Sequence, residues 1–246
     1  MEVSLYQAAA AMNATERWQE MISNNLATAS IPGARKHEIS FSAVQATLAS
    51  SNPTSPGFVI PVAREATNFQ QGELHSTGSP LDFALEGPGF FSVRMPDGQP
   101  AYTRNGEFQL SSQGQLVTAQ GFPVLGDNGP IQFDADSSSS ITISATGEVS
   151  QGGEQKGKLQ ISEFDKPSLL TAIGSGLLRA DSPALKPVPG DATRVRQGFI
   201  ESANSSPTTE MASLITAMRM FESNQKVLSM QSDRMSREIS DLGNPG

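Results

Sequence analysis

The stretch GPGFFSVRMPDGQPAYTR, residues 87–104, decides the fold of the middle of this chain. Residues 90–94 are a short run rich in apolar and β-favouring types, and residues 101–104 are a second such run. Between them stands Pro96-Asp97-Gly98, and Asp-Gly is a strong signal for a tight turn between antiparallel strands. The sequence therefore predicts a β-hairpin here, with Gly98 at a positive φ.

The same pattern of β-rich runs separated by glycine continues on both sides of this hairpin. Such punctuation is typical of an antiparallel meander. We therefore expect residues 68–197 to form a central all-β domain of antiparallel hairpins. Residues 35–67 mix apolar and polar positions and contain the Ser- and Pro-rich run 50–57, which favours a linker.

Both ends of the chain carry long amphipathic helix patterns, with an apolar three-four spacing near the C-terminus from about residue 208 to 242. Neither helix can bury its apolar face locally, so we expect residues 1–34 and 198–246 to form a terminal helical domain, in which residues 1–30 and 205–242 pair antiparallel as a coiled-coil-like layer. The predicted fold class is thus α+β. Met220, Val227 and Met230 lie on a second face of the C-terminal helix, which indicates another packing partner. The predicted assembly interface consists of Leu5, Met12, Trp18, Ile22, Leu26, Leu214, Met218, Met220, Phe221, Val227, Leu228, Met230, Met235 and Ile239.

The composition excludes several classes of protein. The chain has 246 residues and a net charge of −8, and its basic residues do not cluster with aromatic ones, so we expect no nucleic-acid binding. It has no cysteine, which removes disulfides and thiolate sites. No apolar run is long enough to span a membrane, and the first residues lack the pattern of a cleavable signal peptide.

No set of residues predicts a catalytic, cofactor-binding or metal site. His37 and His75 are far apart in polar surroundings, and Asp82, Glu86 and Asp97 lie among turn residues, where Asp commonly bonds to the backbone. The run 87–89 precedes a strand and lacks the Lys-Ser/Thr of a phosphate-binding loop. We therefore expect no cofactor, no small-molecule substrate and no enzymatic activity.

Four segments resemble the flagellar axial family, which comprises the basal-body rod proteins and the hook protein. They are Leu5-Tyr6 with SNNLA at 23–27 and Pro32-Gly33, QGEL at 71–74 with residues 77–91, YTRNGEF at 102–108 with residues 114–118, and QGFIESAN at 197–204 with residues 210–211 and 219–226. Their order is that of the family, although Ala34 stands where an aromatic residue is usual. The residues that carry the motif are Asn24, Asn25, Gly33, Gly72, Asp82, Gly87, Gly89, Phe90, Phe91, Tyr102, Arg104, Gly106, Glu201, Asn204 and Glu222.

The resemblance implies a structural subunit of the flagellar basal-body rod. Such a subunit is exported unfolded by the flagellar type III apparatus without signal cleavage, and polymerises with itself and with other rod and hook subunits into the periplasmic drive shaft. The run Arg219-Met220-Phe221-Glu222 looks more like the proximal rod subunit than the distal one. The alternatives are a distal rod or hook-type subunit, and a secreted binding module that forms a coiled-coil oligomer.

Overall fold

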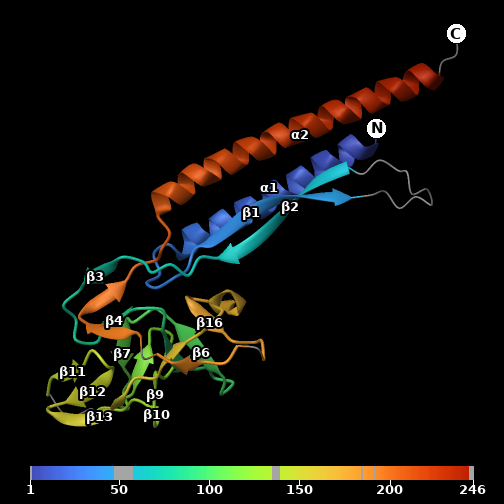
Figure 1. The fold of residues 1–246 in the computed structure, drawn as a ribbon. Coiled ribbons are helices and arrows are strands. Elements are labelled where there is room, and N and C mark those ends of the chain that lie inside the picture. Colours follow the sequence, from blue (N-terminus) through green and yellow to red (C-terminus); the bar gives the residue numbers. More distant parts are fainter. Residues whose placement is uncertain (1, 47–57, 135–138, 184, 191, 244–246) are drawn as a thin grey trace. The chain divides into compact units, whose positions relative to one another are not determined.

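A computed structural model gives the fold of the chain (Figure 1) and describes residues 2–46, 58–134, 139–183, 185–190 and 192–243. The chain divides into two compact units. The first, which we call the helix–hairpin unit, contains residues 1–26, 37–67 and 207–246. The second, the β unit, contains residues 27–36 and 68–206.

The described residues contain two α-helices, α1 (Glu2–Thr28) and α2 (Pro207–Gly243). α2 begins with proline at its first position, where the missing N–H costs no hydrogen bond and the fixed φ suits a helix. α1 ends before Pro32-Gly33, and Gly33 has a φ of +69°, which favours glycine. Local sequence signals therefore account for where both helices stop or start.

β1 (His37–Ala46) and β2 (Phe58–Thr67) form a two-stranded antiparallel sheet in the helix–hairpin unit. Its register runs from His37↔Thr67 to Ala46↔Phe58. The expected linker at 35–67 is therefore largely a β-hairpin. The alternation of side chains along a strand explains why these residues form a hairpin and not a linker. Ile39 and Phe41 project from the same face of β1. Ile39 packs on the helices there, and the Phe41 ring lies 6.0 Å from the ring of Trp18.

The helices contact each other and run antiparallel. Asn224 of α2 donates a hydrogen bond of 3.1 Å to the hydroxyl of Thr15, while Ala217 packs on Met21 and Ile22 farther along α1. The prediction of an α+β fold with a coiled-coil-like helical layer is nevertheless wrong. The chain is mostly β with antiparallel sheets and two helices, and the described residues show no coiled-coil pairing between them.

The departure from a coiled coil has a physical cause in the helix–hairpin unit. The apolar cluster between the helices is small, and Ile39 of β1 packs against it. The hairpin therefore covers apolar helix surface that the sequence predicts to pack against the other helix. Met218, which the predicted seam would bury, is 52% exposed. A coiled coil needs a continuous seam of buried positions, and this contact does not provide one.

The largest sheet of the β unit has six antiparallel strands in the order β15-β16-β6-β5-β14-β17. They are β5 (Phe90–Arg94), β6 (Pro100–Thr103), β14 (Ile161–Glu163), β15 (Thr171–Gly174), β16 (Leu177–Arg179) and β17 (Val188–Pro189). β5 and β6 form the predicted hairpin, in which Gly98 has a φ of +80° and its N–H bonds to the carbonyl of Met95 at 2.9 Å. The prediction for this turn is confirmed.

The remaining strands of the β unit form small antiparallel sheets. Two of these sheets join distant parts of the chain, pairing β3 (Leu74–Ser76) with β19 (Phe199–Glu201) and β4 (Phe83–Glu86) with β18 (Arg194–Gln197). The others are β7 (Phe108–Leu110) with β8 (Leu116–Thr118), β9 (Leu125–Gly126) with β10 (Gly129–Pro130), and β11 (Ile141–Ile143) with β12 (Glu148–Gln151) and β13 (Glu154–Lys158). A 3-10 turn, η1 (Pro167–Leu169), precedes β15.

Two apolar clusters cover the two faces of the six-stranded sheet. Phe91 and Val93 belong to the larger cluster, while Phe90 belongs to a second one with Tyr102 and Phe164. Successive side chains of a strand point to opposite faces, so the consecutive Phe90 and Phe91 serve different clusters. β5 is therefore buried on both faces of the sheet.

Candidate functional site

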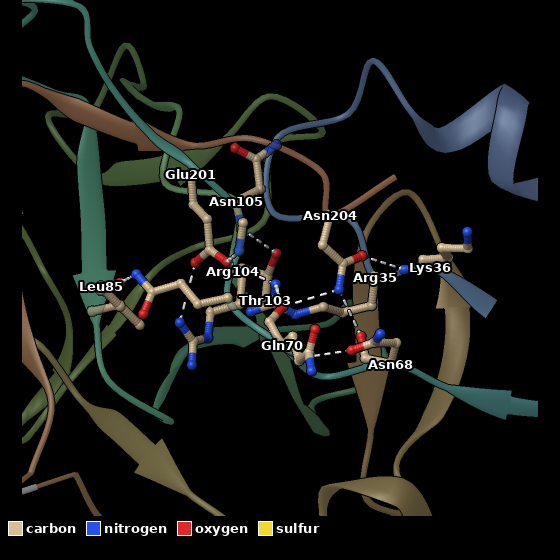
Figure 2. A network of polar contacts seen from close by, with 12 residues as sticks. Arg35, Lys36, Asn68, Gln70, Leu85, Thr103, Arg104, Asn105, Glu201 and Asn204 are labelled. Atoms are coloured by element: carbon tan, nitrogen blue, oxygen red, sulfur yellow. Dashed lines mark hydrogen bonds and ion pairs between the residues drawn. The ribbon is translucent and has the colours of Figure 1, made fainter. Parts of the chain in front are cut away.

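The most enclosed polar group of the β unit is the carboxylate of Glu201, at the end of β19 (Figure 2). Oε1 accepts hydrogen bonds from Arg35 Nη1 at 2.7 Å and from the N–H of Gly72 at 2.8 Å. Oε2 accepts one from Arg104 Nη1 at 3.1 Å. Three segments that are far apart in sequence therefore bind a single carboxylate, and we call this arrangement the Glu201 network.

Arg104 extends the network toward the large sheet. Its Nη2 donates to the carbonyl of Gly87 at 2.5 Å, and its guanidinium lies 4.9 Å from the centre of the Phe90 ring, a cation–π distance. Burial lowers the pKa of Arg104 to about 10, and the charge of Glu201 opposes that effect. The two arginines are almost fully buried, so Glu201 is the counter-charge that makes their burial tolerable.

Asn204 and Arg35 bind the neighbouring backbone (Figure 2). The Asn204 carboxamide accepts a bond from the N–H of Lys36 at 2.6 Å and donates to the carbonyls of Asn68 and Gln70, each at 2.9 Å. Arg35 Nη1 also donates to the Gln70 carbonyl at 2.8 Å. Lys36, Asn68 and Asn204 lie at or near three of the places where the chain passes from one unit to the other.

Glycine is required at three places where the backbone of the β unit packs closely. A Cβ added to Gly72 would overlap the carbonyl oxygen of Ser202, and one added to Gly33 would overlap the backbone of Arg104. Gly106 is similarly confined by the carbonyl of Phe83. These contacts explain why the family motif contains glycine at these positions.

The arrangement is suited to holding chain segments together. Both oxygens of Glu201 are engaged, and the residue has no exposed surface. Among the described residues, no group of three or more His, Asp or Glu could hold a metal ion. A surface cleft of about 430 Å³ in the β unit, bordered by Asp127, Lys158 and Arg194, contains none of the predicted site residues.

A second buried polar contact lies in the helix–hairpin unit. The carboxamide of Asn25 accepts a bond from the N–H of His37 and donates to its carbonyl, both at 2.8 Å. Asn25 also lies 3.4 Å from Oε2 of the buried Glu210 at the start of α2. A residue of α1 thereby binds the first residue of β1 and the first turn of α2.

The motif residues therefore divide between several environments. The structure brings Gly72, Gly87, Phe90, Arg104 and Glu201 into the network, and Gly33 and Asn204 beside it. Asn24 and Glu222 are exposed residues of the helices. The remaining motif residues lie elsewhere in the β unit or helix–hairpin unit and comprise Asn25, Asp82, Gly89, Phe91, Tyr102 and Gly106. Sequence reasoning missed Arg35, because nothing local distinguishes a buried arginine after Pro32-Gly33 from an exposed one.

The predicted interface residues separate into two groups. Those turned at least partly inward are Met12, Trp18, Ile22, Leu26, Leu214, Phe221, Leu228 and Met235. Those exposed on α2 are Met218, Met220, Val227 and Met230. The side chains of Leu5 and Ile239 lie outside the described residues. Within the part of the chain that the structure describes, no helix is long and apolar enough to cross a membrane.

Comparison with known proteins supports one family. The model of the flagellar hook protein FlgE/F/G D1 domain matches residues 84–151, and that of the flagellar basal body rod FlgEFG protein C-terminal matches residues 196–242. The basal-body rod protein FlgG of Borreliella burgdorferi is 34% identical, with 94% of this chain and 95% of the relative aligned. The chain belongs to the flagellar basal-body rod protein family.

Relatives named FlgF are about as similar to this chain as the FlgG relative is. The rod protein FlgF of Rhizobium meliloti is 33% identical over 99% of both chains. That of Escherichia coli K12 is 31% identical, with 96% of this chain and 97% of the relative aligned. In this rod protein, the C-terminal family model covers Glu201, Asn204 and nearly all of α2.

Proposed function

We propose that this chain is a structural rod subunit that polymerises through its two helices. The observation that carries the proposal is the exposed apolar surface of α2, formed by Met211, Ile215, Met218, Met220, Val227 and Met230. A helix that faces water on these sides normally carries charged or polar residues there. Exposed apolar patches of this kind mark protein interfaces.

The exposed residues form two stripes on α2, beside the side that faces α1. At 100° per residue, Met211, Ile215 and Met218 share one direction, while Met220, Val227 and Met230 share another. Leu214, Ala217, Phe221 and Leu228 point in a third direction, toward the buried side. Two exposed stripes fit a subunit that contacts two inequivalent neighbours, and flexible methionine suits such surfaces.

The neighbours, in this proposal, are further copies of the chain and other rod or hook subunits of the flagellar basal body. We place the assembled subunit in the periplasmic part of the rod, reached unfolded through the flagellar type III apparatus without a cleaved signal. The lack of cysteine supports this route, because an unfolded chain without thiols cannot be cross-linked in an oxidising compartment. The role is structural and requires no enzymatic activity.

Within the family we favour the proximal rod type, on the run Arg219-Met220-Phe221-Glu222. The near-equal identities of 34% and 33% to relatives of the two types leave this subtype a prediction. A distal rod or hook-type subunit is the alternative within the same family.

The proposal can be tested with one charged substitution in each stripe of α2. Met218→Asp and Met230→Asp, singly and together, should leave the circular dichroism of the monomer unchanged, because both side chains are exposed. Polymerisation, measured by sedimentation, should be lost, since a carboxylate buried in a subunit contact costs several kcal/mol. Arg219→Gln with Lys226→Gln is the matched control, because these exposed positions lie between the two stripes and the pair changes the net charge by the same two units.

Two outcomes would contradict the proposal. One is a double methionine variant that polymerises like the wild-type chain. The other is a wild-type chain that forms a defined dimer or trimer at every concentration, which would instead favour a coiled-coil oligomeric binding module.

A further inference from the structure

The β1–β2 hairpin has two outer edges, and its hydrogen bonds show which backbone groups point outward. The N–H of Asn68 bonds to the carbonyl of Lys36 at 2.8 Å, so the pair 36↔68 is of the hydrogen-bonded type. In antiparallel sheets, hydrogen-bonded pairs alternate with non-hydrogen-bonded pairs along the strands. Because the pair 36↔68 is hydrogen-bonded, the even-numbered residues of β1 form hydrogen bonds with β2. The odd-numbered residues of both strands therefore direct their N–H and C=O groups away from the hairpin.

Asn25 provides independent support for this assignment. Its carboxamide binds the N–H and the C=O of His37, which is the first outward-directed residue of β1. A side-chain amide here makes the two bonds that a residue of a third strand would make. Among the described residues, the outward N–H groups of Ile39 and Phe41, which follow, receive no such partner.

The two edges differ in their capacity to pair. Pro61 is an outward-directed residue of β2, opposite Ala43, and it has no N–H to offer. The outer edge of β2 is therefore continuous only over residues 63–67, whereas that of β1 is uninterrupted from Ile39 to Gln45. Natural proteins usually protect edge strands with proline or charge, so the unprotected edge of β1 requires an explanation.

We propose that the outer edge of β1 pairs with residues 63–67 of β2 in a second copy of this chain. The proposal rests on the proposed function as a polymerising subunit. The unpaired groups are backbone donors and acceptors at the spacing of a strand, so the occupant that satisfies them is another extended backbone. A two-stranded hairpin is marginally stable alone, and a third strand would stabilise it.

The pairing of two different edges also has the right symmetry for a rod. A contact between β1 and β2 of successive copies is heterologous and can propagate, whereas β1 paired with β1 would close into a dimer. Phe41 is 51% exposed and Val44 is 40% exposed, and they project from opposite faces of β1. A strand added at this edge would place side chains beside both of them.

Cross-linking can test which edges meet, because the chain contains no cysteine. In the proposed contact, the odd-numbered, outward-directed residues of β1 and β2 would form the hydrogen-bonded pairs between copies. The even-numbered residues would then stand opposite each other, so Ser42 would face an even-numbered residue of β2 in the next copy. We would mix Ser42→Cys chains with Ala66→Cys or Arg64→Cys chains, polymerise them, and oxidise. The expected product is a mixed disulfide in about tenfold excess over Ser42→Cys homodimers, the ratio that one paired edge would give over random contact.

Amide hydrogen exchange of the unmodified chain gives a second readout. The Phe41 and Ala43 amides should be protected in the polymer and unprotected in the monomer. Ala43→Pro removes one outward N–H and should raise the concentration needed for polymerisation about tenfold, the effect of one lost hydrogen bond. Ala43→Gly, which keeps the N–H, is the matched control.

A polymer with unprotected Phe41 and Ala43 amides, or one in which Ser42→Cys homodimers predominate, would overturn this inference and leave the proposed function intact. A wild-type chain that stays monomeric at every concentration would overturn both.

Discussion

Arg35 and Glu201 are 166 positions apart in the sequence, and their side chains form a buried ion pair with a separation of 2.7 Å. The pair joins the segment that leaves α1 to the strand that precedes α2. Together with Arg104, this pair joins chain segments of the β unit that lead to and from the helix–hairpin unit.

Replacing Glu201 with glutamine should destabilise the β unit by about 3–5 kcal/mol, because two buried arginines would lose their counter-charge. Urea denaturation followed by circular dichroism measures the change. The control is Glu86→Gln, which removes the charge from an ion pair with Arg196 whose two side chains are about half exposed, and it should cost at most about 1 kcal/mol. Similar losses for the two variants would show that the network contributes no more than a surface pair.

Gly106→Ala and Gly98→Ala should differ in cost although both lie in the β unit. A Cβ at Gly106 would overlap the Phe83 carbonyl oxygen, so we expect a loss of about 3 kcal/mol from the displaced backbone. A Cβ at Gly98 meets no atom, and only its positive φ costs about 1 kcal/mol. Thermal unfolding of the two variants should give this order, and the reverse order would count against the close contact at Gly106.

Asn25→Asp should loosen the start of β1. A carboxylate cannot donate to the His37 carbonyl, and it would stand beside the buried carboxylate of Glu210. We expect faster amide exchange at His37 and a loss of about 2 kcal/mol in the helix–hairpin unit. Asn13→Asp, at an exposed position of α1, is the control and should change neither quantity.

Leu228→Asp should prevent polymerisation while leaving the β unit folded. Leu228 is a half-buried residue of α2, whereas the apolar clusters of the β unit contain no residue from that helix. Sedimentation tests the first expectation and urea denaturation of the β unit tests the second. A variant that assembles normally, or one whose β unit unfolds, would contradict the prediction.

The folding of the dilute monomer is a related prediction. An isolated helix gains little in water unless it packs, and the described contacts of α2 with α1 are few. We expect limited proteolysis to remove the end of α2 first and to leave a resistant fragment that contains residues 68–206 of the β unit. Equal resistance along the whole chain would show that the helices are stable without a neighbour.

Local chemistry made some features predictable from the sequence alone. The hairpin around Gly98 follows from a few adjacent residues, since Asp97 and Gly98 select the turn and the flanking runs favour strands. The helical character of both ends follows from apolar residues repeating at 3.6-residue intervals. The family resemblance also lies in short contiguous motifs, so it could be recognised without coordinates.

The sequence by itself therefore determined the family, the two helices and the central turn, because each depends on residues that are neighbours in the chain. Only the tertiary structure decided that His37–Ala46 and Phe58–Thr67 pair as strands beside the helices, since the three-residue spacing of Phe41 and Val44 by itself favours a helix. It also decided which side of α2 is buried. The partners of Glu201 lie 97, 129 and 166 positions away, and no local pattern records contacts that form only when the whole chain has folded.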